Sequence, residues 1–128
     1  MKLEVGMYVR LVNDVEDIVV INKIANVFET TILTENDGSN YQGEYTKENI
    51  VKASYNIIDI LEVGDYVNGS EVLDFENKYI EEKDTFVPIG VVTENCYLEY
   101  TDSWIIEKNI KSVITHEQIE QMAYKVGE

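Results

Sequence analysis

The chain contains very little cysteine, histidine or proline. Among its 128 residues there is one of each: Cys96, His116 and Pro88. A single cysteine excludes an intrachain disulfide. One Cys and one His cannot make a structural zinc site, which takes four ligands dominated by these two residue types. One proline leaves no room for a Pro-rich linker. We therefore expect a fold held by its hydrophobic core, with no metal.

Sequence motifs for catalysis and cofactor binding are also missing. There is no Gly-rich phosphate loop and no Gly-x-Ser-x-Gly elbow. The acidic stretch 35–44 does not fit an EF-hand, because Gly38 falls at position 4 from Glu35 and the EF-hand glycine stands at position 6. Cys96 and His116 could form a nucleophilic pair, but a lone cysteine in an apolar run is typical of a buried hydrophobe. We expect no enzyme, no cofactor and no catalytic residue.

Long apolar runs are absent as well. No stretch approaches the roughly 18 residues that a membrane-spanning helix needs. The first four residues, Met-Lys-Leu-Glu, do not begin an apolar signal-peptide core. The sequence therefore predicts no signal peptide, no membrane association and a cytoplasmic protein.

Positive charge is scarce. The 25 acidic and 10 basic residues give a net charge of −15. Residues 1–60 carry 10 acidic and 5 basic residues, and residues 61–128 carry 15 and 5, so the second half is more acidic. This field repels nucleic-acid phosphates and anionic membranes, so direct nucleic-acid binding is not expected. A nucleic-acid-binding barrel would need a basic strip from Arg10, Lys23, Lys47 and Lys52, and its binding would be weak and salt-sensitive.

The sequence does contain an internal repeat. Leu3-Glu4-Val5-Gly6-Met7-Tyr8-Val9 recurs as Leu61-Glu62-Val63-Gly64-Asp65-Tyr66-Val67, 58 residues later and with one change. Two shorter matches follow in the same order: Thr34-Glu35-Asn36 with Thr93-Glu94-Asn95, and Asn49-Ile50 with Asn109-Ile110. A unit of about 55–60 residues therefore occurs twice, which is near the smallest size that folds alone.

The first copy has the hydrophobic pattern of short strands separated by turns. Alternating residues predict a strand over 5–12, with Val5, Met7, Val9 and Leu11 on one face. Further strands are expected at 18–21, 30–34, near Tyr41 or Tyr45, and from Ile50. Turns are expected at 13–14 and 36–39, and residues 47–49 interrupt the strand pattern.

The second copy follows the same plan. Asn68-Gly69 predicts a two-residue hairpin turn after Tyr66-Val67. Strands are expected at 72–75 and 86–93, with the acidic residues 76–84 as a hairpin tip or loop and Pro88 at a sheet edge or bulge. Residues 97–100 and 104–106 predict another hairpin around 101–103.

The end of the chain departs from this pattern. Thr115 and Gln118 match a capping box, which predicts a helix of about two turns. Residues 123–126 are expected to form a last strand. The predicted fold is all-β: two tandem SH3-like small barrels, residues 1–58 and 59–128, with a short C-terminal helix in the second.

Three stretches resemble small uncharacterised phage and prophage proteins of low-GC Gram-positive bacteria that have tandem SH3-like barrels. They are 48–54 (Glu-Asn-Ile-Val-Lys-Ala-Ser), 61–69, and 110–115 (Ile-Lys-Ser-Val-Ile-Thr) together with the end 124–127 (Tyr-Lys-Val-Gly). They cover about a third of the chain. The resemblance implies a phage or mobile-element origin, and a host-cell cytoplasmic location. It assigns no activity, and no functional residue can be transferred from it.

The most distinctive candidate for a binding surface is acidic. Two lysines, Lys78 and Lys83, interrupt a cluster of carboxylates: Glu71, Asp74, Glu76, Glu81, Glu82 and Asp84. Such a cluster is usually a solvated face, and the functional hypothesis is a contact surface for a basic protein. The aromatic residues Tyr8, Tyr66, Tyr97, Tyr100 and Trp104 pack a barrel or line a groove for a Pro-rich peptide.

The sequence thus predicts a non-enzymatic protein–protein interaction module of the phage or prophage type. The alternative is an acidic nucleic-acid mimic, whose carboxylates imitate phosphates and occupy a host DNA-binding protein. An evenly spaced row of carboxylates on one face would favour the mimic, and scattered charge would favour a plain adaptor. No oligomeric state is predicted.

Overall fold

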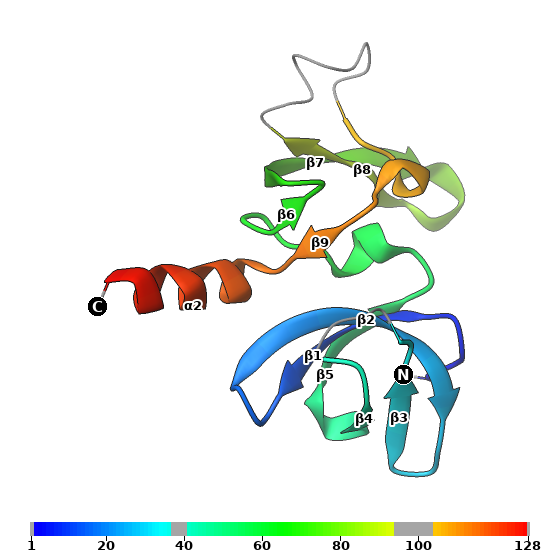
Figure 1. Ribbon diagram of the computed structural model, residues 1–128. Helices are drawn as coiled ribbons and strands as arrows, with labels where there is room; N and C mark the ends of the chain where they lie inside the picture. Colours follow the sequence, from blue (N-terminus) through cyan, green and yellow to red (C-terminus); the bar gives the residue numbers. More distant parts are fainter. Residues whose placement is uncertain (1, 37–40, 94–103, 128) are drawn as a thin grey trace. The chain divides into compact units, whose positions relative to one another are not determined.

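The computed structural model describes residues 2–36, 41–93 and 104–127 (Figure 1). Over these residues the structure consists mainly of β-strands, in two sheets, with one short α-helix. The all-β prediction is therefore confirmed. The chain forms two compact units, one made of residues 1–60 together with 117–128, and the other of residues 61–116.

The first unit contains one antiparallel sheet. Its strands lie in the order β4-β3-β2-β1-β5, so the first and last strands of the unit are neighbours. In Figure 1 the long strand β2 curves across the unit. The elements are β1 (Tyr8–Asn13), β2 (Ile18–Val27), β3 (Thr31–Thr34), β4 (Glu44–Thr46), the 3₁₀ turn η1 (Lys47–Asn49), β5 (Ile50–Ser54) and the 3₁₀ turn η2 (Ile57–Ile60).

Alternation along the strands builds the core of this unit. Met7, Val9 and Leu11 are buried, as the predicted face of β1 requires, and they join a cluster with Ile18, Val20, Ile24 and Ile32. Val5, predicted on the same face, is 57 % exposed, because it precedes the strand and lies in a turn. Burying these aliphatic side chains stabilises the unit by about 1.5–3 kcal/mol each.

The opposite face of β1 buries an arginine. Arg10 is fully buried, and its guanidinium donates hydrogen bonds to the Ile60 carbonyl at 3.3 Å and to Glu117 Oε1 at 2.5 Å. Glu117 lies in the first turn of helix α2 (His116–Gly127). A second contact joins the same helix to the β1–β2 turn, where Gln121 Nε2 donates to the Glu16 carbonyl at 3.2 Å. These two polar contacts hold the helix against the first unit.

The second unit repeats the strand order of the first. Its sheet has the order β8-β7-β6-β9, and Ile105 bridges Val91 on the outer edge of β8, where β4 stands in the first unit. A 3₁₀ turn again precedes the last strand. The elements are β6 (Tyr66–Val67), β7 (Ser70–Ile80), the 3₁₀ turn η3 (Glu81–Lys83), β8 (Thr85–Thr93), the 3₁₀ turn η4 (Glu107–Asn109) and β9 (Val113–Ile114).

The repeated seven residues form the same turn in both units. Gly6 and Gly64 have positive φ angles of 93° and 98°. The Gly6 N–H donates to the Ile24 carbonyl and the Gly64 N–H to the Val72 carbonyl, both at 2.9 Å. Glycine recurs here because this backbone conformation disfavours residues with a Cβ. The repeat in sequence is thus a repeat in backbone geometry.

The predicted two-residue hairpin at Asn68-Gly69 is confirmed. Both residues have positive φ, 52° and 85°, and Val67 pairs directly with Ser70 across the turn. The Asn68 side chain also donates to the Asn109 carbonyl at 2.8 Å and accepts from the Lys111 N–H at 2.7 Å. One turn residue therefore also anchors the segment that leads into β9.

Two predictions near strand ends are wrong. Residues 76–80 are not a loop, because β7 continues to Ile80 and pairs with β8 down to Ile80 and Thr85. Residues 123–126 are not a strand, because α2 runs on to Gly127. Strong helix formers, Glu120 to Ala123, carry the helix through this point. The helix start directly after Thr115 agrees with the capping-box prediction.

Pro88 has the predicted position. It lies in β8, at the edge of the sheet order, and pairs with Asn77 next to an irregularity between Glu76 and Asn77. Residues 37–39 of the turn predicted at 36–39 lie outside the described residues. So do residues 97–103 of the hairpin predicted from 97–100 and 104–106, and the environment of Cys96. The SH3-like boundaries at 1–58 and 59–128 stay a prediction.

Candidate functional site

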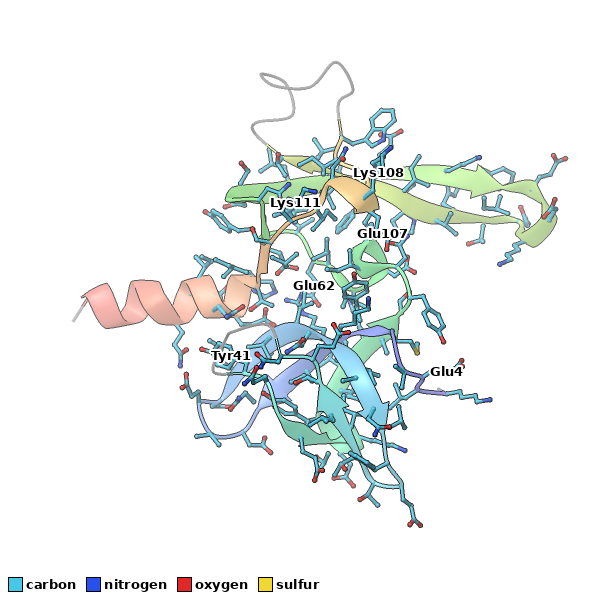
Figure 2. The ribbon with its side chains drawn as sticks, turned by 45° about the vertical axis from the view of Figure 1, so that its right-hand side comes forward. Glu4, Tyr41, Glu62, Glu107, Lys108 and Lys111 are labelled. Atoms are coloured by element: carbon cyan, nitrogen blue, oxygen red, sulfur yellow. The ribbon has the colours of Figure 1, made fainter. Side chains whose placement is uncertain are left out.

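The β7–β8 ribbon is the first candidate surface. Among the described residues, β6 pairs with only the first residues of β7 and Ile105 bridges Val91 of β8, so the outer part of the ribbon consists of two strands (Figure 1). The turn is closed by η3 and by Asp84, whose φ is 48°. Side chains at the end of the ribbon point outward (Figure 2). An isolated two-stranded ribbon is marginally stable in water, so the outer part of this element has little support from its own pairing alone.

Exposed aromatic side chains occupy the end of the ribbon. Tyr79 and Phe86 are directly paired across the strands, with ring centroids 5.2 Å apart and a 55° angle between the rings. They are 47 % and 66 % exposed, and Leu73 farther along β7 is 43 % exposed. Cross-strand aromatic pairs stabilise a hairpin by roughly 0.2–1 kcal/mol. Leaving more than half of the Phe86 side chain in water costs free energy and offsets that gain. Exposed apolar side chains of this kind are common on contact surfaces.

The structure distributes the predicted acidic residues along this ribbon. Glu81, Glu82 and Asp84 are exposed at the turn, and Glu76 is half-buried in the middle of β7. Glu71 lies at the other end, where β7 pairs with Tyr66 of β6. Asp74 is exposed, and its carboxylate accepts a hydrogen bond from the Phe75 N–H at 2.8 Å. The six carboxylates therefore all lie on the β7–β8 ribbon, and four of them are in its outer half, near the aromatic pair.

One acid and one aromatic are directly linked. The Tyr79 hydroxyl donates a hydrogen bond to Asp84 Oδ1. This hydrogen bond, followed by partial desolvation, raises the pKa of Tyr79 above its usual value of 10.0. Tyr79 and Phe86 were not predicted from the sequence to be surface residues. The signal was the placement of large aromatic residues inside a run of charge, which opposes burial of that run.

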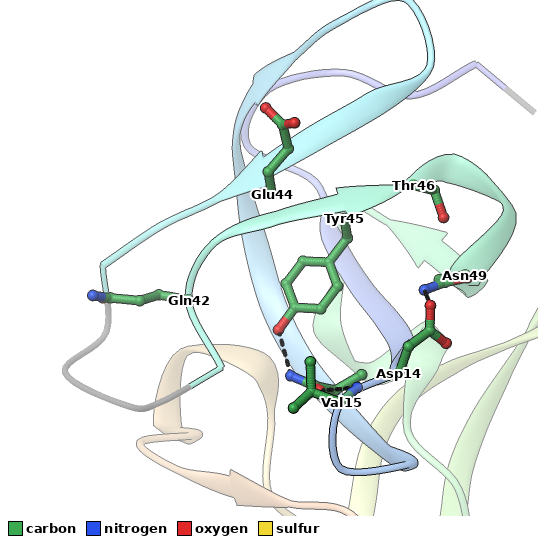
Figure 3. Close-up of a pocket in the computed structure, with 8 residues that line it drawn as sticks. Asp14, Val15, Gln42, Glu44, Tyr45, Thr46 and Asn49 are labelled. Atoms are coloured by element: carbon green, nitrogen blue, oxygen red, sulfur yellow. Dashed lines mark hydrogen bonds between the residues drawn. The ribbon is translucent and has the colours of Figure 1, made fainter.

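A polar pocket in the first unit is the second candidate (Figure 3). It has a volume of about 370 Å³. Three segments line it: the β1–β2 turn, the approach to β4 with β4 itself, and η1. The lining residues are Asn13, Asp14, Val15, Gln42, Glu44, Tyr45, Thr46 and Asn49.

Hydrogen bonds connect the walls of this pocket. Asn13 Nδ2 donates to the Tyr45 hydroxyl at 3.0 Å, and Asn49 Nδ2 donates to Asp14 Oδ2 at 2.8 Å. Asn13 Oδ1 also accepts from the Val15 N–H at 3.1 Å, which holds the turn in shape. The pocket was not predicted, because it depends on residues 30 or more positions apart that strand pairing brings together.

The lone histidine has a carboxylate partner. In the second unit His116 Nε2 lies 2.8 Å from Glu62 Oε1, and the two side chains are 28 % and 32 % exposed. The His116 backbone N–H donates to Asp65 Oδ1 at 2.9 Å. The Cys–His pair considered from the sequence is not tested by this geometry, since Cys96 lies outside the described residues. The contacts of His116 with Glu62 and Asp65 tie this residue, the first of α2, to the repeated turn.

Comparisons with known proteins supply no relative. No protein-family model matches the chain. Searches of curated proteins and of solved structures return no match either. Over the described part of the chain, none of the helices has the length and apolarity to cross a bilayer. The function must therefore be argued from the two surfaces above.

Proposed function

We propose that this chain is a non-enzymatic protein-binding module made of two SH3-like units, with the β7–β8 ribbon as its contact surface for a basic protein. The observation that carries this proposal is the exposed Tyr79–Phe86 pair among carboxylates at the end of a two-stranded ribbon. Aromatic side chains of this kind are enriched at the energetic centres of protein interfaces. Surrounding charge then selects the partner and accelerates encounter.

The strand order supports the SH3-like part of the proposal. Five antiparallel strands in the order β4-β3-β2-β1-β5, with a 3₁₀ turn before the last strand, resemble a small SH3-like barrel. The second unit has the matching order β8-β7-β6-β9, with Ile105 on the outer edge. Folds of this size serve many functions, so the ribbon and not the fold is what supports binding.

The partner's chemistry follows from the charge. Residues 71–84 contain six acidic residues and two lysines, and the chain as a whole carries −15. A basic partner would gain both long-range attraction and close pairing. The resemblance to small phage and prophage proteins supports a mobile-element origin and a partner inside the host cell.

The nucleic-acid mimic is the competing proposal for the same surface. A mimic binds through charge alone, whereas the proposed module also buries Tyr79 and Phe86. Affinity capture from host lysate, run at low and high salt, separates the two. For the module, we expect a basic partner that survives high salt in part and is lost when Tyr79 and Phe86 are both replaced by Ser.

A matched control keeps the test specific. Phe28 in the first unit is also exposed, at 42 %, and Phe28→Ser removes an aromatic ring elsewhere on the chain. Capture that is lost with Phe28→Ser and with the ribbon variants alike would contradict the proposed surface. Capture of a DNA-binding protein that disappears at high salt and ignores the aromatic substitutions would favour the mimic.

A further inference from the structure

The pocket of the first unit is chemically one-sided. Among the described residues that line it there are two carboxylates, from Asp14 and Glu44, and no lysine or arginine. Glu16 and Asp17 follow Asp14 in the same turn and are exposed. Neighbouring charges of one sign raise the local concentration of the opposite charge, especially in a concave site. The pocket therefore attracts a cation and repels an anion.

The polar groups of the pocket are held in place before any ligand arrives. The Asp14 carboxylate is positioned by Asn49, which also donates to the Val12 carbonyl at 3.2 Å. The Tyr45 hydroxyl accepts from Asn13 and donates to the Tyr41 carbonyl. A carboxylate that accepts one hydrogen bond keeps several acceptor positions for a ligand. Preorganised acceptors of this kind reduce the ordering cost of binding.

One wall of the pocket is aromatic. Figure 3 shows the Tyr45 ring between Gln42 on one side and Asp14 and Val15 on the other, with Glu44 and Thr46 on the same strand. No hydrogen bond or ion pair within the described residues involves the Glu44 carboxylate, which is exposed. A planar cation can stack on such a ring while its edge meets a carboxylate.

We propose that this pocket binds the guanidinium of an arginine side chain presented by a partner peptide. Guanidinium offers several donors in one plane, which suits acceptors on different walls together with an aromatic face. A lysine ammonium is a compact, strongly hydrated charge and would use the ring less well. Calcium requires six to eight oxygen ligands, and the Asn49 amide group already directs a donor at Asp14 Oδ2. This site is separate from the β7–β8 ribbon and does not depend on the function proposed for it.

A short synthetic peptide tests the assignment. The probe is acetyl-Gly-Arg-Gly-amide, titrated into the ¹⁵N-labelled full chain and followed by NMR. The matched ligand carries citrulline, which has nearly the same shape as arginine but no charge. We expect the arginine peptide to shift the side-chain amide signals of Asn13 and Asn49 and the backbone signal of Val15, and to bind at least about tenfold more tightly than the citrulline peptide.

Two substitutions with the same charge change locate the binding. Asp14→Asn removes a pocket carboxylate and keeps an oxygen for Asn49, and it should weaken the arginine peptide about tenfold. Asp17→Asn is the control, because Asp17 does not line the pocket and asparagine tolerates its positive φ of 53°. Asp17→Asn should weaken binding of the arginine peptide by less than about twofold, because it lowers only the long-range electrostatic attraction.

Three results would overturn the assignment. Equal binding of the arginine and citrulline peptides would remove the role of charge. Equal losses for Asp14→Asn and Asp17→Asn would show a general attraction without a site. Displacement of the arginine-induced shifts by calcium ions at lower concentration than the peptide would make this a divalent-cation site.

Discussion

Asp65 shows how one residue can distinguish two otherwise similar turns. Its counterpart in the first unit is Met7, whose sulfur accepts from the Glu4 N–H at 3.3 Å. Asp65 Oδ2 accepts from the Glu62 N–H at 2.7 Å, and its other oxygen accepts from the His116 N–H. Asp65 is fully buried. The single change within the repeated heptad therefore adds a link from the turn to the start of α2.

Removing this carboxylate should destabilise the protein strongly. Asp65→Ala removes a fully buried acceptor of two partly buried N–H groups, and losing each of these hydrogen bonds costs about 1–3 kcal/mol. We expect the free energy of unfolding, measured by urea denaturation, to fall by about 2–4 kcal/mol. The control is Asp59→Ala, which removes an exposed carboxylate that accepts a hydrogen bond from Ser54 Oγ. Similar losses for the two variants would contradict the role given to Asp65.

The Tyr79–Asp84 contact predicts a specific pH dependence. Because the pKa of Tyr79 is raised in the folded state, its proton is held more tightly there than in the unfolded chain. The contribution of Tyr79 to folding stability is therefore complete below pH 10.0, and it is lost as the pH rises through the raised pKa. ¹³C NMR of the Tyr79 ring should give a midpoint above 10.0, and Asp84→Asn should lower it. A midpoint that Asp84→Asn leaves unchanged would mean that the hydrogen bond is not formed.

At the scale of elements, the two glycine turns offer a matched comparison. Both glycines have positive φ, so alanine is strained at either position by about 1 kcal/mol. The surroundings differ. A Cβ on Gly6 would meet only a Tyr55 ring carbon at 4.0 Å, whereas a Cβ on Gly64 would lie 3.3 Å from the His116 Cβ.

We therefore expect Gly64→Ala to cost more than Gly6→Ala. The additional loss should be about 1 kcal/mol in the free energy of unfolding, because a close Cβ contact forces the start of α2 to shift. Urea denaturation of both variants under the same conditions measures the difference. A larger loss for Gly6→Ala would show that the two turns have different roles from those described here.

The C-terminal helix depends on its buried ion pair. Arg10 is fully buried and the Glu117 side chain is 28 % exposed, so removing Glu117 leaves a buried charge with fewer partners. Glu117→Gln should lower the free energy of unfolding by about 2–3 kcal/mol, somewhat less than for a fully buried pair. The double variant Arg10→Met/Glu117→Leu should recover most of the loss, because no buried charge remains. A double variant as unstable as the single one would contradict this explanation.

The sequence predicted these elements unevenly, for physical reasons. Alternation identified Met7, Val9 and Leu11 as core, and Asn68-Gly69 identified a hairpin, because both are local properties of the backbone. Residues 76–80 appeared to be a loop because their side chains are charged, but cross-strand pairing with β8 keeps them extended. The pocket joins residues 30 or more positions apart, so local patterns could not show it. Tyr79 and Phe86 pair within a single hairpin, and they were missed because residues 76–84 were predicted to be a hairpin tip or loop.

At the scale of the whole molecule, the charge is the dominant property. A net charge of −15 on 128 residues favours encounter with a basic partner and disfavours anionic ones. The second half of the sequence carries two thirds of that net charge, −10 against −5, and it also contains the exposed ribbon. The two folded units share the charge more evenly, because residues 61–116 carry 12 acidic and 4 basic residues, a net −8, and residues 1–60 with 117–128 carry −7.

Site-specific photo-crosslinking tests the central claim most directly. A photoreactive phenylalanine analogue is placed at Phe86, and in a second protein at Phe28, and each is irradiated in host lysate at low and high salt. We predict one basic protein crosslinked through position 86, in part retained at high salt, and absent from the position-28 sample. Crosslinking through position 28 alone, or no difference between the two positions, would contradict a binding surface on the β7–β8 ribbon.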